Sequence, residues 1–408
     1  MVRRLTLGLL LLSICAISPA SSQSVVPPTT SGDMIFDAWA SDFQGRALAA
    51  GISFDVLSRE MSGLTPDVRV ANADSRQPEF SKPISEYLKG VVTSDRLAIG
   101  LRRRAEVAAF PAIEVQFGVP SDILLGIWAL ESGFGSIQGD RDALRSLSTL
   151  AAQGRRRTWA EGEIIAILNI IESGEQPRST LRGSWAGAMG QTQFIPSTYL
   201  STAVDQDGDG RRDIWTSSAD ALGSAANLLA KAGWVRGQSW AREVTAPADF
   251  DFSLTEGPKE SPMWWAERGV VAANGIAWSP EDHNALAQLV APAGEAGPLF
   301  LLFPNHFAIR KYNNSLAYAL GVGLLADRFA GGRPLVRAWP KEVPLSLMDR
   351  MIAQRALTVL GFDPGVPDGV VGMSTRQSLR AWQKSRGLVA DGYLSSDMIV
   401  RLKAESGG

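Results

Sequence analysis

Apolar residues recur at helical spacing along most of this 408-residue chain. Repeats at every third or fourth position are typical of amphipathic helices, and they predict helices over 34–50, 53–62, 94–117, 141–153, 158–174, 217–232 and 313–329. Between about 235 and 305 the pattern changes to short strand-like runs, of which 299–303 is the clearest. We therefore expect a mainly α-helical protein with a small β-rich insertion. A Gly/Pro-bearing linker at 331–344 then leads to a separate small helical unit at 345–408.

A further helix is expected in the segment 119–135, and it carries an unusual acid. Glu131 lies on the same face of this helix as three apolar residues, Leu124, Ile127 and Trp128. A carboxylate at the end of an apolar face is poorly solvated, so its pKa should rise and it could hold a proton near neutral pH. Such a group can act as a general acid. The alternative is that Glu131 is half exposed to water at the helix end and has no catalytic role.

The N-terminus has the pattern of a secretory signal peptide. Arg3 and Arg4 precede an apolar run over 5–17, and small residues follow as far as position 22. We expect a signal peptide over 1–23 and a Pro-rich linker over 24–33, and therefore an exported, periplasmic protein. The apolar run is too short for a membrane span.

The cysteine count and the net charge argue against disulfide bonds and against nucleic-acid binding. Cys15 is the only cysteine and lies in the predicted signal, so we expect no disulfide in the mature chain. It could instead carry a lipid anchor, but the bulky Ile14 before it makes this the less favoured alternative. The net charge of −2 becomes −4 when Arg3 and Arg4 are removed, which argues against nucleic acid as a partner.

Two loops between the predicted helices have the composition of functional segments. Residues 182–199 are rich in glycine, amides and aromatics and are expected to form a loop close to a ligand. Residues 205–211 (DQDGDGR) follow the first half of an EF-hand calcium loop. Its expected ligands are the carboxylates of Asp205, Asp207 and Asp209 and the carbonyl of Arg211. Position twelve is Thr216 and not glutamate, so Asp213 or Asp220 would complete the site; the alternative is a solvated acidic loop.

The C-terminal unit contains one motif twice. An Asp-Gly turn followed by a capped helix is predicted at 367–375 (PDGVVGMST) and again at 390–397 (ADGYLSSD). Both could simply be helix connectors.

Four motifs in a fixed order resemble a known enzyme family. ESGFG at 131–135, GSWAGAMGQTQFIPS at 183–197, the acidic loop from 205, and RKYNNSLAYA at 310–319 are similar to lytic murein transglycosylases of the membrane-bound B type. The resemblance covers about 35–330, and 345–402 resembles small three-helix peptidoglycan-binding domains. It implies a mainly α, lysozyme-like α+β catalytic core over 34–330 with a β-rich insertion, and a C-terminal three-helix domain.

The resemblance also implies roles for individual residues. Glu131 matches the catalytic acid/base of the family, and Ser184 and Gln193 match polar groups beside the cleaved bond. The matches to residues lining the sugar groove are Arg156, Arg157, Tyr312, Asn313 and Tyr318. Leu228 and Gln191-Thr192 depart from some members. The expected partners are glycan strands and stem peptides bound by a monomer, with no cofactor for catalysis and a structural calcium ion.

The implied activity is cleavage of the MurNAc–GlcNAc β-1,4 bond with formation of 1,6-anhydroMurNAc ends. Hydrolases of this kind typically use a second carboxylate, and none lies between 182 and 199. A transglycosylase can dispense with it, because the C6 hydroxyl of the substrate attacks its own anomeric carbon. Two alternatives remain open. One is a muramidase that recruits a second carboxylate from Asp140, Asp142, Glu161 or Glu163, and the other is a non-catalytic wall-binding protein.

Overall fold

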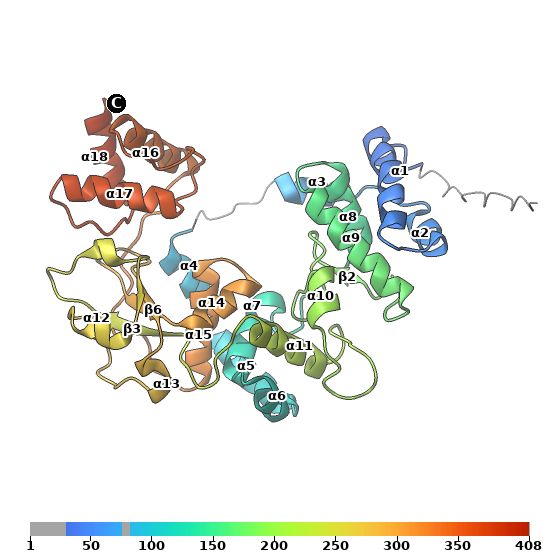
Figure 1. Cartoon of the computed structure of the whole chain (residues 1–408), viewed down its shortest axis with the longest axis horizontal. Helices are drawn as coiled ribbons and strands as arrows, with labels where there is room; N and C mark the ends of the chain where they lie inside the picture. The colour runs from blue at the N-terminus through green and yellow to red at the C-terminus, as the bar shows by residue number, and fades with distance from the viewer. Residues whose placement is uncertain (1–29, 76–81, 408) are drawn as a thin grey trace, which may run out of the picture.

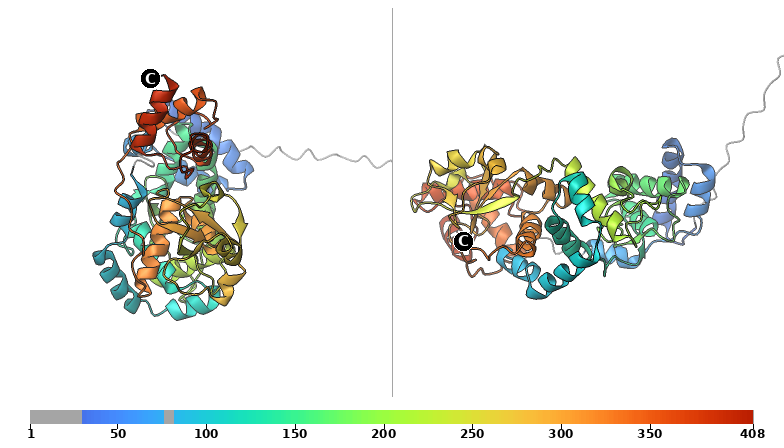
Figure 2. Two further views of the ribbon diagram at one scale, coloured as in Figure 1. Left: turned by 90° about the vertical axis from the view of Figure 1, so that its left-hand side faces the viewer. Right: turned by 90° about the horizontal axis from the view of Figure 1, so that it is seen from below.

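The computed structural model of the chain describes residues 30–75 and 82–407. The predicted signal peptide and most of the predicted linker 24–33 lie outside the described residues. The described part is elongated, with a helical bundle at its N-terminal end, a central group of helices, and the β-rich insertion and C-terminal domain at the other end (Figures 1 and 2). Each of these four parts has its own hydrophobic core.

The N-terminal bundle joins helices that are far apart in sequence. Trp39 and Phe43 stack on the buried face of the first helix and belong to the same core as Leu144 and Leu147 of α8. Burial of these side chains is the main favourable term that holds the bundle together. Its elements are α1 (Met34–Ala49), α2 (Phe54–Met61), α3 (Val68–Ser75), β1 (Arg141–Asp142), α8 (Ala143–Ala152), α9 (Arg157–Glu172), β2 (Arg182–Gly183) and α10 (Pro196–Thr202).

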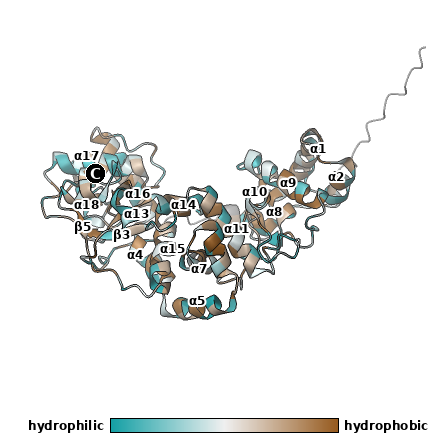
Figure 3. Ribbon diagram, turned by 60° about the horizontal axis from the view of Figure 1, so that its bottom comes forward, coloured by the Kyte–Doolittle hydropathy of each residue, from teal (hydrophilic) through white to brown (hydrophobic). Residues whose placement is uncertain are grey.

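The central group is built around α7 (Ser121–Ser132), whose residues from Ile123 to Ala129 are all buried. Figure 3 shows α7 as an apolar helix in the middle of the molecule. It packs along α15 (Leu316–Phe329), and a side chain at Gly126 would meet the Val322 carbonyl at 2.8 Å. Gly126 therefore permits the close approach of the two helices. The other members are α4 (Ile84–Val91), α5 (Ser94–Glu106), α6 (Phe110–Phe117), α11 (Ser218–Lys231) and α14 (Pro304–Tyr312).

The predicted single helix over 94–117 is wrong, because the chain leaves α5 after Glu106 and begins α6 at Phe110. Pro111 lies in the first turn of α6, where its missing N–H costs nothing. Similarly, the helix predicted over 313–329 begins only at Leu316, and α14 before it was not anticipated. No single helix among the described residues is long and apolar enough to cross a membrane; α6 and α7 pass that test only as a pair, which is bent by 109°.

The predicted insertion contains a five-stranded antiparallel sheet in the order β4-β6-β7-β3-β5. All four residues of β7 are buried, and both of its neighbours pair with it. The elements are β3 (Ala241–Thr245), the 3₁₀ turn η1 (Phe252–Leu254), β4 (Lys259–Glu260), α12 (Pro262–Ala266), β5 (Val271–Ala272), α13 (Pro280–His283), β6 (Ala287–Val290) and β7 (Leu299–Leu302).

Three helices form the C-terminal domain, α16 (Leu347–Val359), α17 (Met373–Ser385) and α18 (Ser396–Ser406), around the fully buried Trp382. The domain is docked on the β-rich insertion. Arg376 and Arg380 both bind the carboxylate of Glu256 there, at 2.8 Å each.

The predicted linker packs against the β-rich insertion as well as connecting it to the C-terminal domain. Its Val336 and Arg337 N–H groups donate to Glu243 of β3, and Trp339 stacks with Phe300 of β7.

Candidate active site

The end of α7 is tied to the glycine-rich loop by the motif that follows Glu131. Gly133 ends the helix in the left-handed conformation, and Ser132 Oγ donates to the Gln191 carbonyl while accepting the Gly135 N–H. Gly135 has a φ of +81°, which L side chains rarely adopt, and a side chain there would meet Gln191 Oε1 at 2.7 Å, so glycine is favoured at this approach. The two motifs thus form one structure that holds Glu131 at the helix end.

Glu131 itself is half-buried and accepts one hydrogen bond from a tyrosine. Tyr318, from α15, donates its hydroxyl to Glu131 Oε1 at 2.5 Å. Burial raises the pKa of Glu131 from 4.5 to about 7, against the smaller lowering effect of the Tyr318 hydrogen bond. This agrees with the expected raised pKa. The side chain is partly exposed, as the alternative supposed, but the burial of its carboxyl group is enough to raise the pKa.

Three of the five tyrosines in the chain interact with this carboxyl group. Tyr312 donates its hydroxyl to the Thr192 carbonyl at 2.7 Å and so fastens α14 to the glycine-rich loop. Burial, with the negative charge of Glu131 as the next cause, raises the pKa of Tyr312, Tyr318 and Tyr87. All three hydroxyls therefore remain protonated donors at neutral pH. Tyr87, on α4, was not identified from the sequence as a residue near Glu131. The only hint in the sequence was that the chain has just five tyrosines.

Ser184 and Gln193 stabilise the glycine-rich loop in this structure. Ser184 Oγ accepts the N–H groups of Ala186 and Ala188, and Gln193 Nε2 donates to the carbonyls of Gln138 and Gly190. Gln193 also adopts a positive φ of 51°, which is uncommon for a residue with a side chain and typical of functional loops. The loop is therefore pre-shaped beside Glu131.

The remaining predicted groove residues lie at the end of α14 and in the N-terminal bundle. Asn313 is exposed at the end of α14. Arg156 precedes α9 and Arg157 begins it, in the N-terminal bundle, where the Arg156 guanidinium lies 5.9 Å from the Trp159 ring. The structure thus joins Glu131 with Tyr318, and places the two arginines on a different part of the molecule.

The carboxylates that a muramidase would recruit have structural partners. Asp142 caps α8 and pairs with Arg178 at 2.7 Å. Glu161 accepts hydrogen bonds from Trp39 and Arg46. Glu163 accepts the N–H and the hydroxyl of Ser197 in the first turn of α10. The last of the four, Asp140, is exposed. None of these contacts directs a second carboxylate toward Glu131, which disfavours the muramidase alternative.

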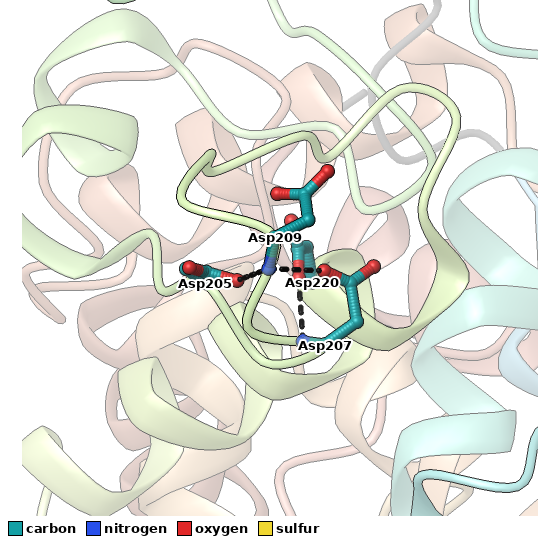
Figure 4. Close-up of side chains that lie close together, drawn as sticks. All are labelled: Asp205, Asp207, Asp209 and Asp220. Atoms are coloured by element: carbon teal, nitrogen blue, oxygen red, sulfur yellow. Dashed lines mark hydrogen bonds between the residues drawn. The ribbon is translucent and has the colours of Figure 1, made fainter.

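Four acidic side chains gather in the predicted calcium loop (Figure 4). Oxygens of Asp205, Asp207, Asp209 and Asp220 all lie within 4.8 Å of one another. Asp220 is fully buried and accepts the N–H groups of Gln206, Asp207 and Asp213, which draws the loop onto α11.

Of the two other predicted ligands, Asp213 is outside the cluster of carboxylates. The carboxylate of Asp213 accepts the N–H groups of Trp215 and Thr216 instead, so of the two candidates for the last ligand it is Asp220 that joins the cluster. The Arg211 carbonyl stays a predicted ligand, and the N–H of the same residue donates to Asp209 Oδ1 at 2.8 Å.

A glutamate whose pKa is raised by burial, in a mainly helical core, is the general acid expected of lysozyme-like enzymes that cleave glycans. The family model of the transglycosylase SLT domain matches residues 35–327, and that of a putative peptidoglycan-binding domain matches residues 348–402. The chain therefore belongs to the SLT-domain lytic transglycosylases, with a C-terminal peptidoglycan-binding domain. This confirms the resemblance, the fold class and the enzymatic nature expected from the sequence, and it removes the support for a non-catalytic protein.

Similar proteins include membrane-bound lytic murein transglycosylase B of Escherichia coli, 32% identical over 252 residues that cover 60% of this chain and 67% of that protein. The crystal structure of SltB3 from Pseudomonas aeruginosa in complex with NAG-anhNAM-pentapeptide is 44% identical, with a TM-score of 0.86, over 91% of this chain and 100% of that chain. The E. coli lytic transglycosylase Slt35 in complex with calcium is 28% identical, with a TM-score of 0.60, over 72% of this chain and 92% of that chain.

Proposed function

We propose that this enzyme cleaves the MurNAc–GlcNAc β-1,4 bond of peptidoglycan and leaves 1,6-anhydroMurNAc ends. The observation that carries the proposal is Glu131, whose pKa of about 7 allows both of its protonation states near neutral pH. One carboxyl can then serve both proton transfers of the reaction. The complexes of similar proteins with NAG–NAM–pentapeptide fragments support the choice of substrate.

The reaction needs no water and no second carboxylate. Glu131 donates its proton to the bridging O4 as the bond from C1 of MurNAc to O4 breaks. The resulting carboxylate then takes the proton of the C6 hydroxyl as O6 bonds to C1. One bond breaks, one forms, and Glu131 ends in its starting state.

Tyr318 positions the acid in this scheme. Its hydroxyl holds Glu131 Oε1, which leaves Oε2 for the substrate oxygens. The same bond stabilises the carboxylate that exists between the two proton transfers.

Mass spectrometry of the products from purified sacculi tests the proposal. Ends that resist borohydride reduction and carry the mass of 1,6-anhydroMurNAc are expected. Reducible MurNAc ends would mean that water attacked C1, and the muramidase alternative would then replace this proposal.

A structural calcium ion is proposed for the loop at 205–220. Four carboxylates within 4.8 Å of one another repel each other strongly unless a cation lies between them, and hard oxygen ligands suit Ca²⁺. The Slt35 complex with calcium, in a similar protein, supports the same assignment. The ion would brace the loop that connects α10 to α11, and the catalytic steps above do not involve it.

Location and assembly follow from the substrate. Peptidoglycan lies outside the cytoplasmic membrane, so we infer a periplasmic enzyme exported by the segment 1–23, without a lipid on Cys15 and acting as a monomer. Cell fractionation with N-terminal sequencing of the mature protein tests the export, and light scattering tests the monomer.

A further inference from the structure

The two Asp-Gly turns of the C-terminal domain are copies of one hydrogen-bonded unit. In the first, Gln354 Nε2 donates to Asp368 Oδ1 at 3.1 Å and Gln354 Oε1 accepts the Gly369 N–H at 2.7 Å. In the second, Gln383 does the same with Asp391 Oδ1 at 2.9 Å and the Gly392 N–H at 2.8 Å. The aspartate also accepts the N–H two residues further on in both. The two turns are therefore a repeated structural unit and not simply the helix connectors that the sequence also allowed.

The second turn binds a peptide segment of the β-rich insertion. Asp391 Oδ2, the oxygen that the unit itself does not use, accepts the Glu295 N–H at 3.0 Å. Gly294 before it has a φ of +66°, and an L side chain there would meet Asp391 Oδ2 at 2.4 Å and the Tyr393 Cβ at 2.7 Å. The bound residue must therefore be glycine or a D-amino acid, whose side chain projects the other way and which favours positive φ.

The first turn presents the same acceptor without such a partner. Asp368 is exposed, and its Oδ2 accepts no hydrogen bond from residues 30–75 or 82–407. The two helix positions that flank the glycine differ between the copies. They are Arg376 and Arg380 at the second turn and the apolar Leu347 and Met351 at the first.

The surroundings of the first turn indicate the chemistry of its ligand. The side chains against Gly369 are the apolar Leu347 and Met351, and the adjoining Val370 is 47% exposed. One arginine also lies at this turn, but the Arg350 guanidinium donates to the Gly369 and Leu345 carbonyls, at 2.6 and 2.9 Å. The arginines of the second turn hold an acidic residue, Glu256, whereas the first turn suits a small apolar one.

We propose that the first Asp-Gly turn binds a peptide through Asp368 Oδ2, at an amide N–H that follows a D-alanine residue. The contact between Asp391 and Gly294-Glu295 is the internal counterpart of this complex. The proposal rests on the proposed function, because the stem peptides of peptidoglycan are the D-alanine-containing peptides that this enzyme would meet. It assigns wall recognition to the peptide and not to the glycan.

The test uses the full chain with Glu131→Gln, so that wall material is bound and not digested. The probes are a synthetic stem pentapeptide ending in D-Ala-D-Ala and its diastereomer ending in L-Ala-L-Ala, titrated by calorimetry. Asp368→Asn is the informative variant, because Asn keeps the Oδ1 acceptor for Gln354 and Val370 but replaces Oδ2 with a donor. Asp363→Asn is the matched control, since Asp363 is an exposed aspartate of the same domain that accepts the Gly365 N–H through Oδ1.

We expect the D-pentapeptide to bind the parent and the Asp363→Asn variant equally. It should bind Asp368→Asn about tenfold more weakly, the effect of one hydrogen bond to a charged group. The L-diastereomer should bind the parent about as weakly. Equal binding to Asp368→Asn and to the parent at unchanged melting temperature, or equal binding of the two diastereomers, would overturn the proposal.

The outcome is separable from that of the proposed function. Wild-type enzyme that forms 1,6-anhydroMurNAc ends while Asp368→Asn binds normally refutes the peptide site alone. Reducible ends with a binding defect in Asp368→Asn refute the reaction and leave the peptide site supported.

Discussion

Replacement of Glu131 with glutamine is expected to abolish turnover and, at the same time, to stabilise the fold at neutral and alkaline pH. Glutamine has nearly the same shape and can still accept the Tyr318 hydrogen bond through its carbonyl oxygen. It cannot donate and recover a proton, and loss of general acid–base catalysis costs about two to four orders of magnitude in rate. The stability effect arises from the raised pKa of Glu131.

The sign and size of that effect follow from proton linkage. The carboxyl ionises at 4.5 in the unfolded chain and at about 7 in the fold, so between these values the folded state holds a proton that the unfolded state has lost. The free energy of unfolding of the wild type therefore falls as pH rises from 4.5 to about 7. At about 1.36 kcal/mol per pKa unit the loss reaches about 3 kcal/mol, an upper limit for a half-buried group. Glutamine does not titrate and avoids this loss.

Thermal unfolding of both proteins at a series of pH values measures the difference. Glu131→Gln and wild type should melt together below pH 4.5 and diverge in favour of the variant as pH rises to about 7, by several degrees. Glu267→Gln is the control, because the Glu267 side chain is 74% exposed and should give no such divergence. A difference that does not change with pH, or that favours the wild type above pH 7, would refute the buried-acid argument. Activity within tenfold of wild type would remove Glu131 from the mechanism.

Three further predictions concern Tyr318, the calcium loop and the C-terminal domain. Tyr318→Phe removes a hydrogen bond that lowers the pKa of Glu131, so the alkaline limb of the pH–rate profile should move up by about one unit, and an unchanged or lowered limb would contradict the positioning role. Calcium should raise the free energy of unfolding by about 1.4 kcal/mol for each tenfold rise in its free concentration above the dissociation constant, and the melting temperature should rise with it. Asp205→Ala should remove that response. A wild type whose melting temperature is unchanged by calcium and by chelator would refute the site. A chain ending after Pro340, with Glu256→Gln so that no carboxylate is left unpaired, should bind sacculi less but still cleave short soluble glycans; loss of that cleavage in a folded protein would assign the C-terminal domain a part in the reaction.

Local sequence was enough to predict the features whose cause is local. The apolar face and glycine ending of α7 follow from the spacing of residues within twelve positions. That spacing was enough to predict a raised pKa for Glu131, although the burial that raises it is tertiary. The acidic loop was recognisable because a calcium loop places its ligands within one short segment. The four ordered motifs also indicated the family, because each one is a continuous segment.

Tertiary structure decided the features that depend on distant segments. Tyr318 meets Glu131 across 187 positions, because Gly126 lets α15 approach α7 closely. The family resemblance placed Tyr318 in the sugar groove but did not say which side chain it would meet. The choice of Asp220 over Asp213 was decided in the same way, by the backbone N–H groups that each carboxylate accepts.

The C-terminal domain shows the same division most directly. Its two turns share the Asp-Gly pair, and each forms the same unit with the glutamine of the helix before it. Only the packed structure shows that one turn is filled by Gly294-Glu295 and the other is exposed. A local motif determines the hydrogen bonds within itself, whereas its neighbours are chosen by the burial and charge of surfaces that come together only when the whole chain has folded.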